Sequence, residues 1–218
     1  NKDTYEQQDV VKWYLDDTLL QPAEKKIFTT LEDSLKDFSM LDLGIGGGRT
    51  TVYFEPLVKR YIGTDYSKNM IESCKKKFPG LDLRVLDARV MSEFKDNTFD
   101  LILFSFNGID YMNKNDRDKT LKEIKRICKK NGVFVFSTHN INVIPKMFSL
   151  KISFNAWRLA SRILKLIKLY IYNGIPFRHL GKEIIINDGA HNFSLRTFYI
   201  DPNEQISQLK DLGFSNVT

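Results

Sequence analysis

The feature that most constrains this chain is the stretch Met40–Thr50, in which a short apolar run ends in a carboxylate and a glycine-rich turn follows. A helix-like segment comes next, an order typical of a nucleotide site built at the end of a parallel strand. A dinucleotide site requires the spacing G-x-G-x-x-G. Counting from Gly44 puts Arg49 at the third glycine position, and counting from Gly46 puts Thr51 there. Both registers fail, which argues against a dinucleotide.

The spacing that does fit is acid-x-G-x-G-x-G, filled by Asp42, Gly44, Gly46 and Gly48. In this pattern the chain resembles the first motif of class I S-adenosylmethionine-dependent methyltransferases. The resemblance implies S-adenosylmethionine as methyl donor and S-adenosylhomocysteine as product. The donor has no pyrophosphate but carries an ammonium group, so a carboxylate at the strand end suits it, and glycines let the backbone approach its amino-acid part. An ordinary glycine-rich turn is the alternative.

Two further acids are predicted to lie at strand ends. Asp65 ends the short strand predicted over Arg60–Asp65, about 20 residues after the glycines, where a carboxylate takes the ribose hydroxyls. A carboxylate suits them because it accepts two hydrogen bonds at once, and Tyr66 comes next. Asp87 matches the position at which the family's acid meets the adenine amino group, with Ala88 framing the base. The alternative for each acid is a solvated loop side chain.

The run Asn97–Phe104 is predicted to be a strand buried on both faces. Its Phe-Asp start resembles the family's fourth motif. In this fold the end of the fourth strand faces the methyl group, so Phe104 and Asn107 are predicted to contact the cofactor, and Asp110 and Tyr111 the substrate. No Asn-Pro-Pro-Tyr or Asp-Pro-Pro-Tyr sequence follows, which counts against the methyltransferases that act on DNA bases and glutamine.

Strands and helices alternate between residues 39 and 140, so the sequence predicts a doubly wound α/β fold. Its core is a mostly parallel sheet of the seven-stranded type with helices on both faces, residues 39–140. Residues 1–38 are predicted to be helical, as a lid over the cofactor or as plain packing on the sheet edge. Residues 141–193 are predicted to be a mainly helical cap insertion. Residues 194–218 are expected to return to the core and stop before its last strand, so we expect a longer native protein.

A general base would assist methyl transfer to a hydroxyl group, although an activated donor needs mainly alignment and proximity. His139, at the end of the fifth predicted strand, is the first candidate, and His191 is the second. A structural or surface role is the alternative for each histidine. Cys74 and Cys128 form no C-x-x-C pattern. We therefore expect a reduced, cytoplasmic protein without a metal site.

Charge is distributed unevenly along the chain. The net charge is +6, yet no Asp or Glu occurs between Ile124 and Lys182. Within this acid-free stretch, residues 153–172 are predicted to form a basic amphipathic helix. Three interpretations stay open: a cap helix packed apolar side down over the substrate pocket, a surface that docks on an anionic membrane, and an RNA contact or dimer interface. The basic residues of the stretch are Lys125, Arg126, Lys129, Lys130, Lys146, Lys151, Arg158, Arg162, Lys165, Lys168, Arg178 and Lys182.

Together these features predict a methyltransferase acting on an oxygen or nitrogen of a small anionic molecule, such as a phosphorylated or nucleotide-linked sugar. The acid-free stretch is the reason for expecting an anionic acceptor. The cap and the C-terminal half are loosely similar to bacterial methyltransferases of surface-polysaccharide and natural-product pathways. RNA methylation is one alternative, and a non-catalytic, membrane-associated cofactor-binding protein is another. A monomer and a homodimer are both compatible with the sequence.

Overall fold

The computed structural model describes residues 2–174 and 181–218, which divide into two compact units. We call residues 2–109 and 115–137 the sheet unit. The described parts of 110–114 and 138–218 form the small unit. The predicted basic residue Arg178 lies outside the described residues.

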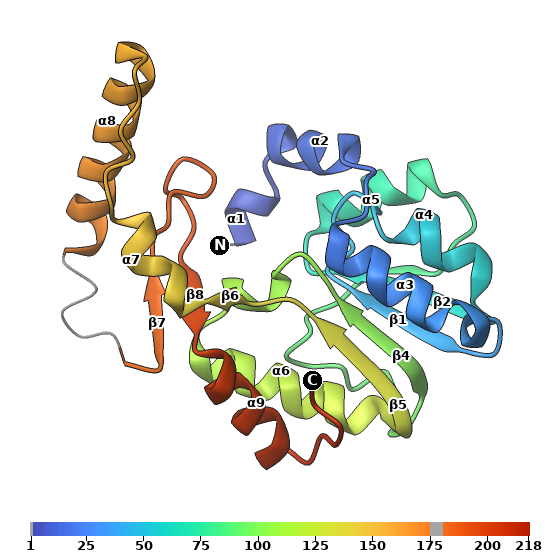
Figure 1. Ribbon diagram of the computed structural model, residues 1–218. Coiled ribbons are helices and arrows are strands. Elements are labelled where there is room, and N and C mark those ends of the chain that lie inside the picture. Colours follow the sequence, from blue (N-terminus) through green and yellow to red (C-terminus); the bar gives the residue numbers. More distant parts are fainter. Residues whose placement is uncertain (1, 175–180) are drawn as a thin grey trace. The chain divides into compact units, whose positions relative to one another are not determined.

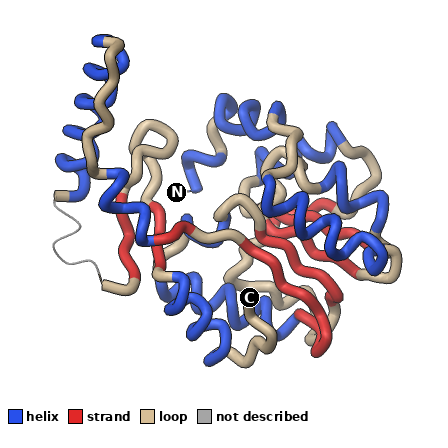
Figure 2. Tube along the Cα trace, in the orientation of Figure 1, coloured by secondary structure: helices blue, strands red, loops and turns tan. Residues whose placement is uncertain are grey.

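Five parallel strands form the centre of the sheet unit (Figures 1 and 2). They are, in spatial order, β3 (Leu83–Val85), β2 (Arg60–Asp65), β1 (Ser39–Leu43), β4 (Phe99–Phe104) and β5 (Cys128–Phe136). The chain starts in the middle of the sheet and then winds to either side, so β1 and β4 adjoin at the switch point where such folds place their ligands. The predicted α/β fold with a parallel sheet is confirmed.

Three helices precede β1, helices follow β1, β2 and β4, and β3 leads to β4 without a helix between them. The helices are α1 (Lys2–Tyr5), α2 (Gln8–Asp16), α3 (Pro22–Leu35), α4 (Thr51–Phe54), α5 (Lys68–Lys77) and α6 (Lys114–Ile127), with 3₁₀ turns η1 (Glu55–Leu57) and η2 (Gly108–Tyr111). The sequence favours one helix from Tyr5 to Leu20, but Gln7 has an extended backbone that separates α1 from α2. Ser67 caps α5, since its side chain accepts a hydrogen bond from Met70 N.

The junction between α6 and β5 differs from what the sequence favours, which is a helix stop at Gly132. The helix ends at Ile127 and the strand begins directly at Cys128. The register between β4 and β5 shifts between Phe99 and Leu101, so extra residues bulge from β5. A Cβ on Gly132 would lie 2.8 Å from Cys128 Sγ and 2.9 Å from Phe99 O. Glycine therefore permits the close approach at the bulge, and it caps no helix.

A second sheet of three strands forms the small unit, with β8 in the middle. The strands are β6 (His139–Asn140), β7 (Glu183–Ile186) and β8 (Thr197–Ile200). β8 runs antiparallel to β7 and parallel to β6. The seven-stranded-type sheet of the prediction is thus observed as five parallel strands plus this separate sheet. No strand occurs among residues 212–218.

The long helix predicted over residues 153–172 is present as α8 (Ala156–Asn173), but only part of its predicted apolar side is packed. Its role as a cap over a substrate pocket stays a prediction. Leu169 is the one buried residue of α8, and it packs in a cluster with Ile144 and Phe148. Ile163 and Ile171, expected to face inward, are exposed. Among residues 2–174 and 181–218, no helix combines the length and apolar content needed to cross a bilayer. The other helices of the small unit are η3 (Ile141–Val143), α7 (Ile144–Met147) and α9 (Pro202–Asp211).

Candidate active site

The glycine-rich loop follows β1 at the carboxyl end of the parallel sheet. Gly44, Gly46 and Gly48 have positive φ angles of 66°, 51° and 77°, a conformation that glycine adopts without strain. A Cβ on Gly44 would lie 3.0 Å from the ring of Phe104, which is buried at the end of β4. The loop therefore exposes backbone at Gly44, which Phe104 supports from the sheet, whereas Gly46, Gly47 and Gly48 are buried.

Asp42, predicted to face the donor's ammonium group, is almost completely buried, with 1% of its surface exposed. Its Oδ2 accepts hydrogen bonds from Thr50 Oγ1 at 2.6 Å and from Tyr61 Oη at 2.8 Å. Burial raises the pKa of the Asp42 carboxyl from 3.8 to about 7, although both hydroxyl donors oppose the rise. Asp42 thus braces the glycine loop against β2, and its contact with a donor stays a prediction.

Asp65 lies at the end of β2, and both of its oxygens face the glycine loop and the start of α5. Its Oδ2 accepts from Gly46 N at 3.0 Å, and its Oδ1 accepts from Ser67 N at 2.8 Å. Burial raises the pKa of Asp65 from 3.8 to about 6, and the backbone N–H groups oppose the rise. The Tyr66 backbone also donates to this carboxylate. A carboxylate has about four acceptor positions, so these bonds leave capacity for a ribose hydroxyl.

The N-terminal segment lies against the glycine loop. A Cβ on Gly46 would lie 3.1 Å from the ring of Tyr14, and one on Gly47 would lie 2.1 Å from Tyr14 O. The carboxylate of Glu6 accepts from Lys68 N at 3.0 Å and from Asn69 N at 3.2 Å, at the N-terminus of α5, where a negative charge is stabilising. This placement favours the lid interpretation. Sequence reasoning missed both Glu6 and Tyr14.

A buried ion pair links the loop to α3. The guanidinium of Arg49 pairs with both carboxylate oxygens of Glu24, one bond measuring 2.8 Å, and 8% of each side chain is exposed. Burial opposes ionisation of Glu24, but hydrogen bonds from Arg49 and from Gln21 N hold its pKa below its usual value. Arg49 also lies 4.9 Å from the ring centre of Phe106. The sequence contained no signal for this pairing, since the partners lie 25 positions apart.

The predicted adenine contacts follow β3. Asp87 is part-exposed and forms an ion pair with Arg89, which also pairs with Asp116 at 2.9 Å. Ala88 is buried at 9% exposure. The ring of Tyr66 packs edge-on against Tyr5 at 5.9 Å between centroids. An adenine amino group would therefore share Asp87 with Arg89, and these contacts stay predictions.

Strain is concentrated just after β4. Phe106 and Asn107 have positive φ angles of 54° and 59°, a conformation that costs energy for residues other than glycine and is common at functional sites. Asn107 N donates a hydrogen bond to Ser137 Oγ at 2.8 Å, which holds the turn to the residue following β5. Asn107 therefore lies on a turn that a hydrogen bond holds in place. Its contact with the cofactor stays a prediction.

The small unit holds a carboxylate–histidine pair. Asp110, at 0% exposure, accepts from His139 N at 2.6 Å and Thr138 Oγ1 at 2.7 Å, and its Oδ2 lies 2.8 Å from His139 Nδ1. Because an ionised carboxylate only accepts, this contact favours the tautomer with the proton on Nδ1, in which the lone pair lies on Nε2. The geometry favours a positioning role for Asp110 over the predicted substrate contact.

Two other predicted residues of the small unit have less defined surroundings. His191 begins a left-handed turn with Asn192 and Phe193, whose φ angles are 45°, 56° and 67°. Tyr111 is the last residue of η2. Burial is the main cause that raises the pKa of Tyr199, and the nearby Asp188 and Tyr111 raise it further. The roles predicted for His191 and Tyr111 stay predictions.

The predicted residues divide between the two units. Those predicted to hold the cofactor lie in the sheet unit, and the predicted catalytic and substrate residues lie in the small unit. The cofactor set is Asp42, Gly44, Gly46, Gly48, Asp65, Tyr66, Asp87, Ala88, Phe104 and Asn107, and the other set is Asp110, Tyr111, His139 and His191.

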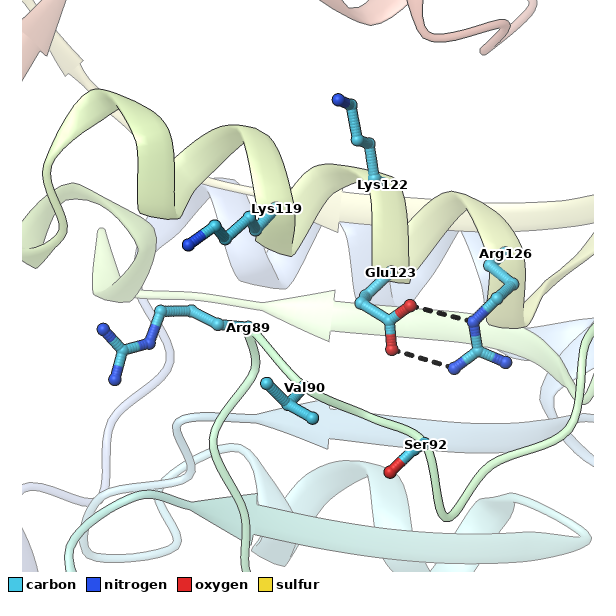
Figure 3. A pocket seen from close by; sticks show the side chains of 7 residues that line it. All are labelled: Arg89, Val90, Ser92, Lys119, Lys122, Glu123 and Arg126. Atoms are coloured by element: carbon cyan, nitrogen blue, oxygen red, sulfur yellow. Dashed lines mark hydrogen bonds and ion pairs between the residues drawn. The ribbon is translucent and has the colours of Figure 1, made fainter.

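A groove of about 530 Å³ lies between the segment after β3 and α6 (Figure 3). Its walls are rich in cations, but these are largely neutralised by neighbours. Arg126 pairs with Glu123 and Asp96, and Arg89 pairs with Asp87. None of its lining residues belongs to the predicted cofactor set, so the groove carries no site assignment. The lining residues are Arg89, Val90, Ser92, Lys119, Lys122, Glu123 and Arg126.

Comparison with known proteins points to one family. Residues 41–136 match the methyltransferase domain. The ubiquinone/menaquinone biosynthesis C-methyltransferase of Desulfotalea psychrophila is 28% identical over 158 residues, covering 71% of this chain and 55% of that protein. The ubiquinone biosynthesis O-methyltransferase of Pelagibacter ubique is 30% identical over 120 residues, covering 53% of this chain and 48% of that protein. The chain thus spans about half the length of these curated relatives.

Among solved structures, the PH0226 protein of Pyrococcus horikoshii shares the fold. The match has a TM-score of 0.57 at 20% identity and covers 90% of this chain and 84% of that one.

Proposed function

The chain belongs, through residues 41–136, to the class I S-adenosylmethionine-dependent methyltransferase family, and from this premise we propose that it methylates a small-molecule acceptor. The observation that carries the proposal is a hydrogen bond between the loop that follows β1 and the last residue of β2. The glycine loop after β1 donates from Gly46 N to Asp65 Oδ2 at the end of β2, at 3.0 Å. This pairing holds the buried glycine backbone and a buried carboxylate side by side.

The glycine loop of residues 44–48 and Asp65, which together we call the corner, fit S-adenosylmethionine. Gly44 is exposed, so its backbone is open to the amino-acid part of the donor, while Gly46 and Gly48 lie against Tyr14 and Phe78. Asp65 accepts backbone bonds from Gly46, Ser67 and Tyr66, which leaves acceptor capacity for a donor hydroxyl group. Bound there, S-adenosylmethionine would supply an electrophilic methyl group. Tyr14 on α2 would cover the loop and limit the access of water, a role supported by its contact with Gly46 and Gly47.

His139 is the proposed general base for a hydroxyl acceptor. The acceptor oxygen would bond to the methyl carbon as the carbon–sulfur bond breaks with its electron pair on sulfur, and Nε2 of His139 would take the hydroxyl proton. Asp110 would act through His139, because its carboxylate favours a proton on Nδ1 and fixes the ring at 2.8 Å. His191, at the start of a left-handed turn, is the second candidate for the base.

The proposed acceptor is a small molecule that carries negative charge, such as a phosphorylated or nucleotide-linked sugar. The stretch without Asp or Glu from Ile124 to Lys182 supports this class. A quinol is a second candidate, because the names of two matched relatives place those proteins in ubiquinone or menaquinone biosynthesis. RNA is the third class, for which the same cations would contact phosphates.

A screen of labelled methyl transfer tests the proposal. Sugar nucleotides, quinols, small amines and RNA are offered to the wild type and to Asp65→Ala, with S-adenosylmethionine as donor. We expect transfer to one small-molecule class, lost in Asp65→Ala. Transfer to RNA alone would contradict the acceptor class. Saturable donor binding without transfer to any class would instead favour a non-catalytic cofactor-binding protein.

A further inference from the structure

The helix α8 carries an unusual combination of exposed side chains. Trp157 is 83% exposed and Ile171 is 74% exposed, and Leu164, Ile167 and Tyr172 are exposed as well. The segment before the helix adds three more exposed apolar residues, Leu150, Ile152 and Phe154. Large apolar surfaces of this kind mark binding sites in soluble proteins.

These side chains form a stripe. Turning about 100° per residue, Trp157, Leu164 and Ile171 are seven positions apart and fall on one line along the helix. Ile163 and Ile167 widen this line toward one edge, and Lys168 borders its other edge. Lys165, Arg158 and Arg162 follow farther round the helix, on the side that carries Leu169. Leu169 and Leu166 point the opposite way, into the small unit, where Leu169 is 2% exposed. The apolar stripe therefore lies on the outward side of the helix, with Lys168 at its edge and the three other exposed cations on the flank beside Leu169.

The chain is built to hold this face outward. At the far end of α8, Asn155 caps the helix by accepting from Arg158 N, and Arg162 Nη1 donates to Lys151 O and Ile152 O at 3.1 Å. These bonds tie the apolar segment 150–154 along the helix, which Figure 1 shows extending beyond α7 and the small sheet. At the near end, Tyr170 Oη donates to Phe148 O at 3.2 Å. The stripe is thus the outward side of a helix that is anchored at one end.

The charges select the kind of partner. Within residues 2–174 and 181–218, no carboxylate forms an ion pair with any of the four cations of α8: Arg158, Arg162, Lys165 and Lys168. The acid-free stretch also makes a second copy a poor partner, because two such faces would bring like charges together. The stripe is mostly aliphatic, so it needs an apolar medium, which nucleic acid phosphates do not provide.

We propose that α8 and the segment 150–155 dock on an anionic lipid surface, with α8 lying in the plane of the interface. The stripe would enter the boundary between headgroups and acyl chains, and the cations would contact anionic headgroups, as basic amphipathic helices do. Eighteen residues span about 27 Å, but four charges along the helix exclude a spanning orientation. This inference concerns α8 alone and holds whether or not the chain transfers methyl groups.

Vesicle co-sedimentation tests the proposal, with phosphatidylcholine vesicles that contain or lack about a third of phosphatidylglycerol. We expect binding to the anionic vesicles that weakens as salt rises. Each cation near such a surface contributes about fivefold to partition, so Arg158→Gln/Lys165→Gln should lose about twenty-fivefold. The matched control is Lys25→Gln/Lys26→Gln, which removes two exposed lysines of α3 and should bind like the wild type. Equal loss in both variants, or equal binding to neutral vesicles, would overturn the proposal.

A second readout isolates the apolar stripe. The chain has two tryptophans, Trp13 and Trp157, so Trp13→Phe leaves Trp157 as the sole reporter. Its emission should shift to shorter wavelength and be quenched by brominated acyl chains when anionic vesicles are added. Trp157→Ala/Leu164→Ala should reduce vesicle binding at least tenfold with unchanged thermal unfolding, since both side chains are exposed. Unquenched Trp157 emission, or a dimer that this variant dissociates, would contradict lipid docking.

Discussion

Replacing Asp42 by Asn should change how the stability of the protein depends on pH. Asp42 is buried and its folded-state pKa is about 7, against 3.8 for an ordinary carboxyl. The folded protein therefore binds more protons than the unfolded chain between about pH 4 and pH 7. Over this window the free energy of unfolding falls as the pH rises, and above it the contribution of Asp42 levels off. Stability due to this group is fully present only at low pH.

The size of the effect follows from these two pKa values. Integrated from pH 5 to pH 8, the contribution of Asp42 lowers the free energy of unfolding by about 2–3 kcal/mol. An asparagine amide oxygen can still accept from Thr50 Oγ1 and Tyr61 Oη, the two bonds that Asp42 accepts at 2.6 and 2.8 Å. Asp65, whose pKa is also raised, is present in both proteins, so its contribution cancels in the comparison.

Urea unfolding at pH 5 and pH 8 measures the effect in the wild type and in Asp42→Asn. We expect the wild type to lose about 2–3 kcal/mol more than the variant between the two pH values. The control is Asp33→Asn, which changes an exposed carboxyl of α3 and should leave the wild-type dependence unchanged. Equal pH dependence in the wild type and Asp42→Asn would show that Asp42 is already ionised at pH 5, and would refute the reasoning.

Three further substitutions test other contacts. Glu24→Gln leaves the buried Arg49 guanidinium with Asp17, 3.5 Å from its Nε, as its remaining ion-pair partner, so urea unfolding should show a loss of about 2–4 kcal/mol. A loss below about 1 kcal/mol, the value expected for an exposed pair, would contradict the pairing. Gly47→Ala places a Cβ 2.1 Å from Tyr14 O and should make the N-terminal segment sensitive to limited proteolysis, while Gly181→Ala should not. Asp110→Asn should reduce methyl transfer at least tenfold and shift its pH profile, and an unchanged profile would exclude the positioning role.

The parallel sheet could be predicted because its signals are local. The glycine spacing and the apolar runs of β1, β2 and β4 each occupy a few consecutive residues, and the doubly wound order follows from their alternation with helices. The end of α6 was less predictable. Lys130, Asn131 and Gly132 have the composition of a helix stop, but pairing with β4 draws the chain into a bulged strand at Cys128.

The position of a candidate residue was predictable where it follows from a strand end, as with Asp65, the last residue of β2. It was not predictable where two distant segments meet. Tyr14 against Gly47, and Glu6 at the start of α5, depend on how the N-terminal helices fold back over the loop. Which face of α8 is buried was also not predictable, because helical periodicity defines an apolar and a polar face but does not say which residues pack against the rest of the chain. Leu169 decides that question through its contacts with Ile144 and Phe148.

The central claim is that the corner, formed by the glycine loop and Asp65, holds S-adenosylmethionine. Isothermal titration of the folded protein with this donor tests the claim most directly, with Asp65→Ala and with NAD as comparisons. We expect saturable binding of one S-adenosylmethionine to each wild-type chain, loss of that binding in Asp65→Ala, and no binding of NAD. Binding of NAD, or undiminished binding of the donor by a folded Asp65→Ala variant, would contradict the account.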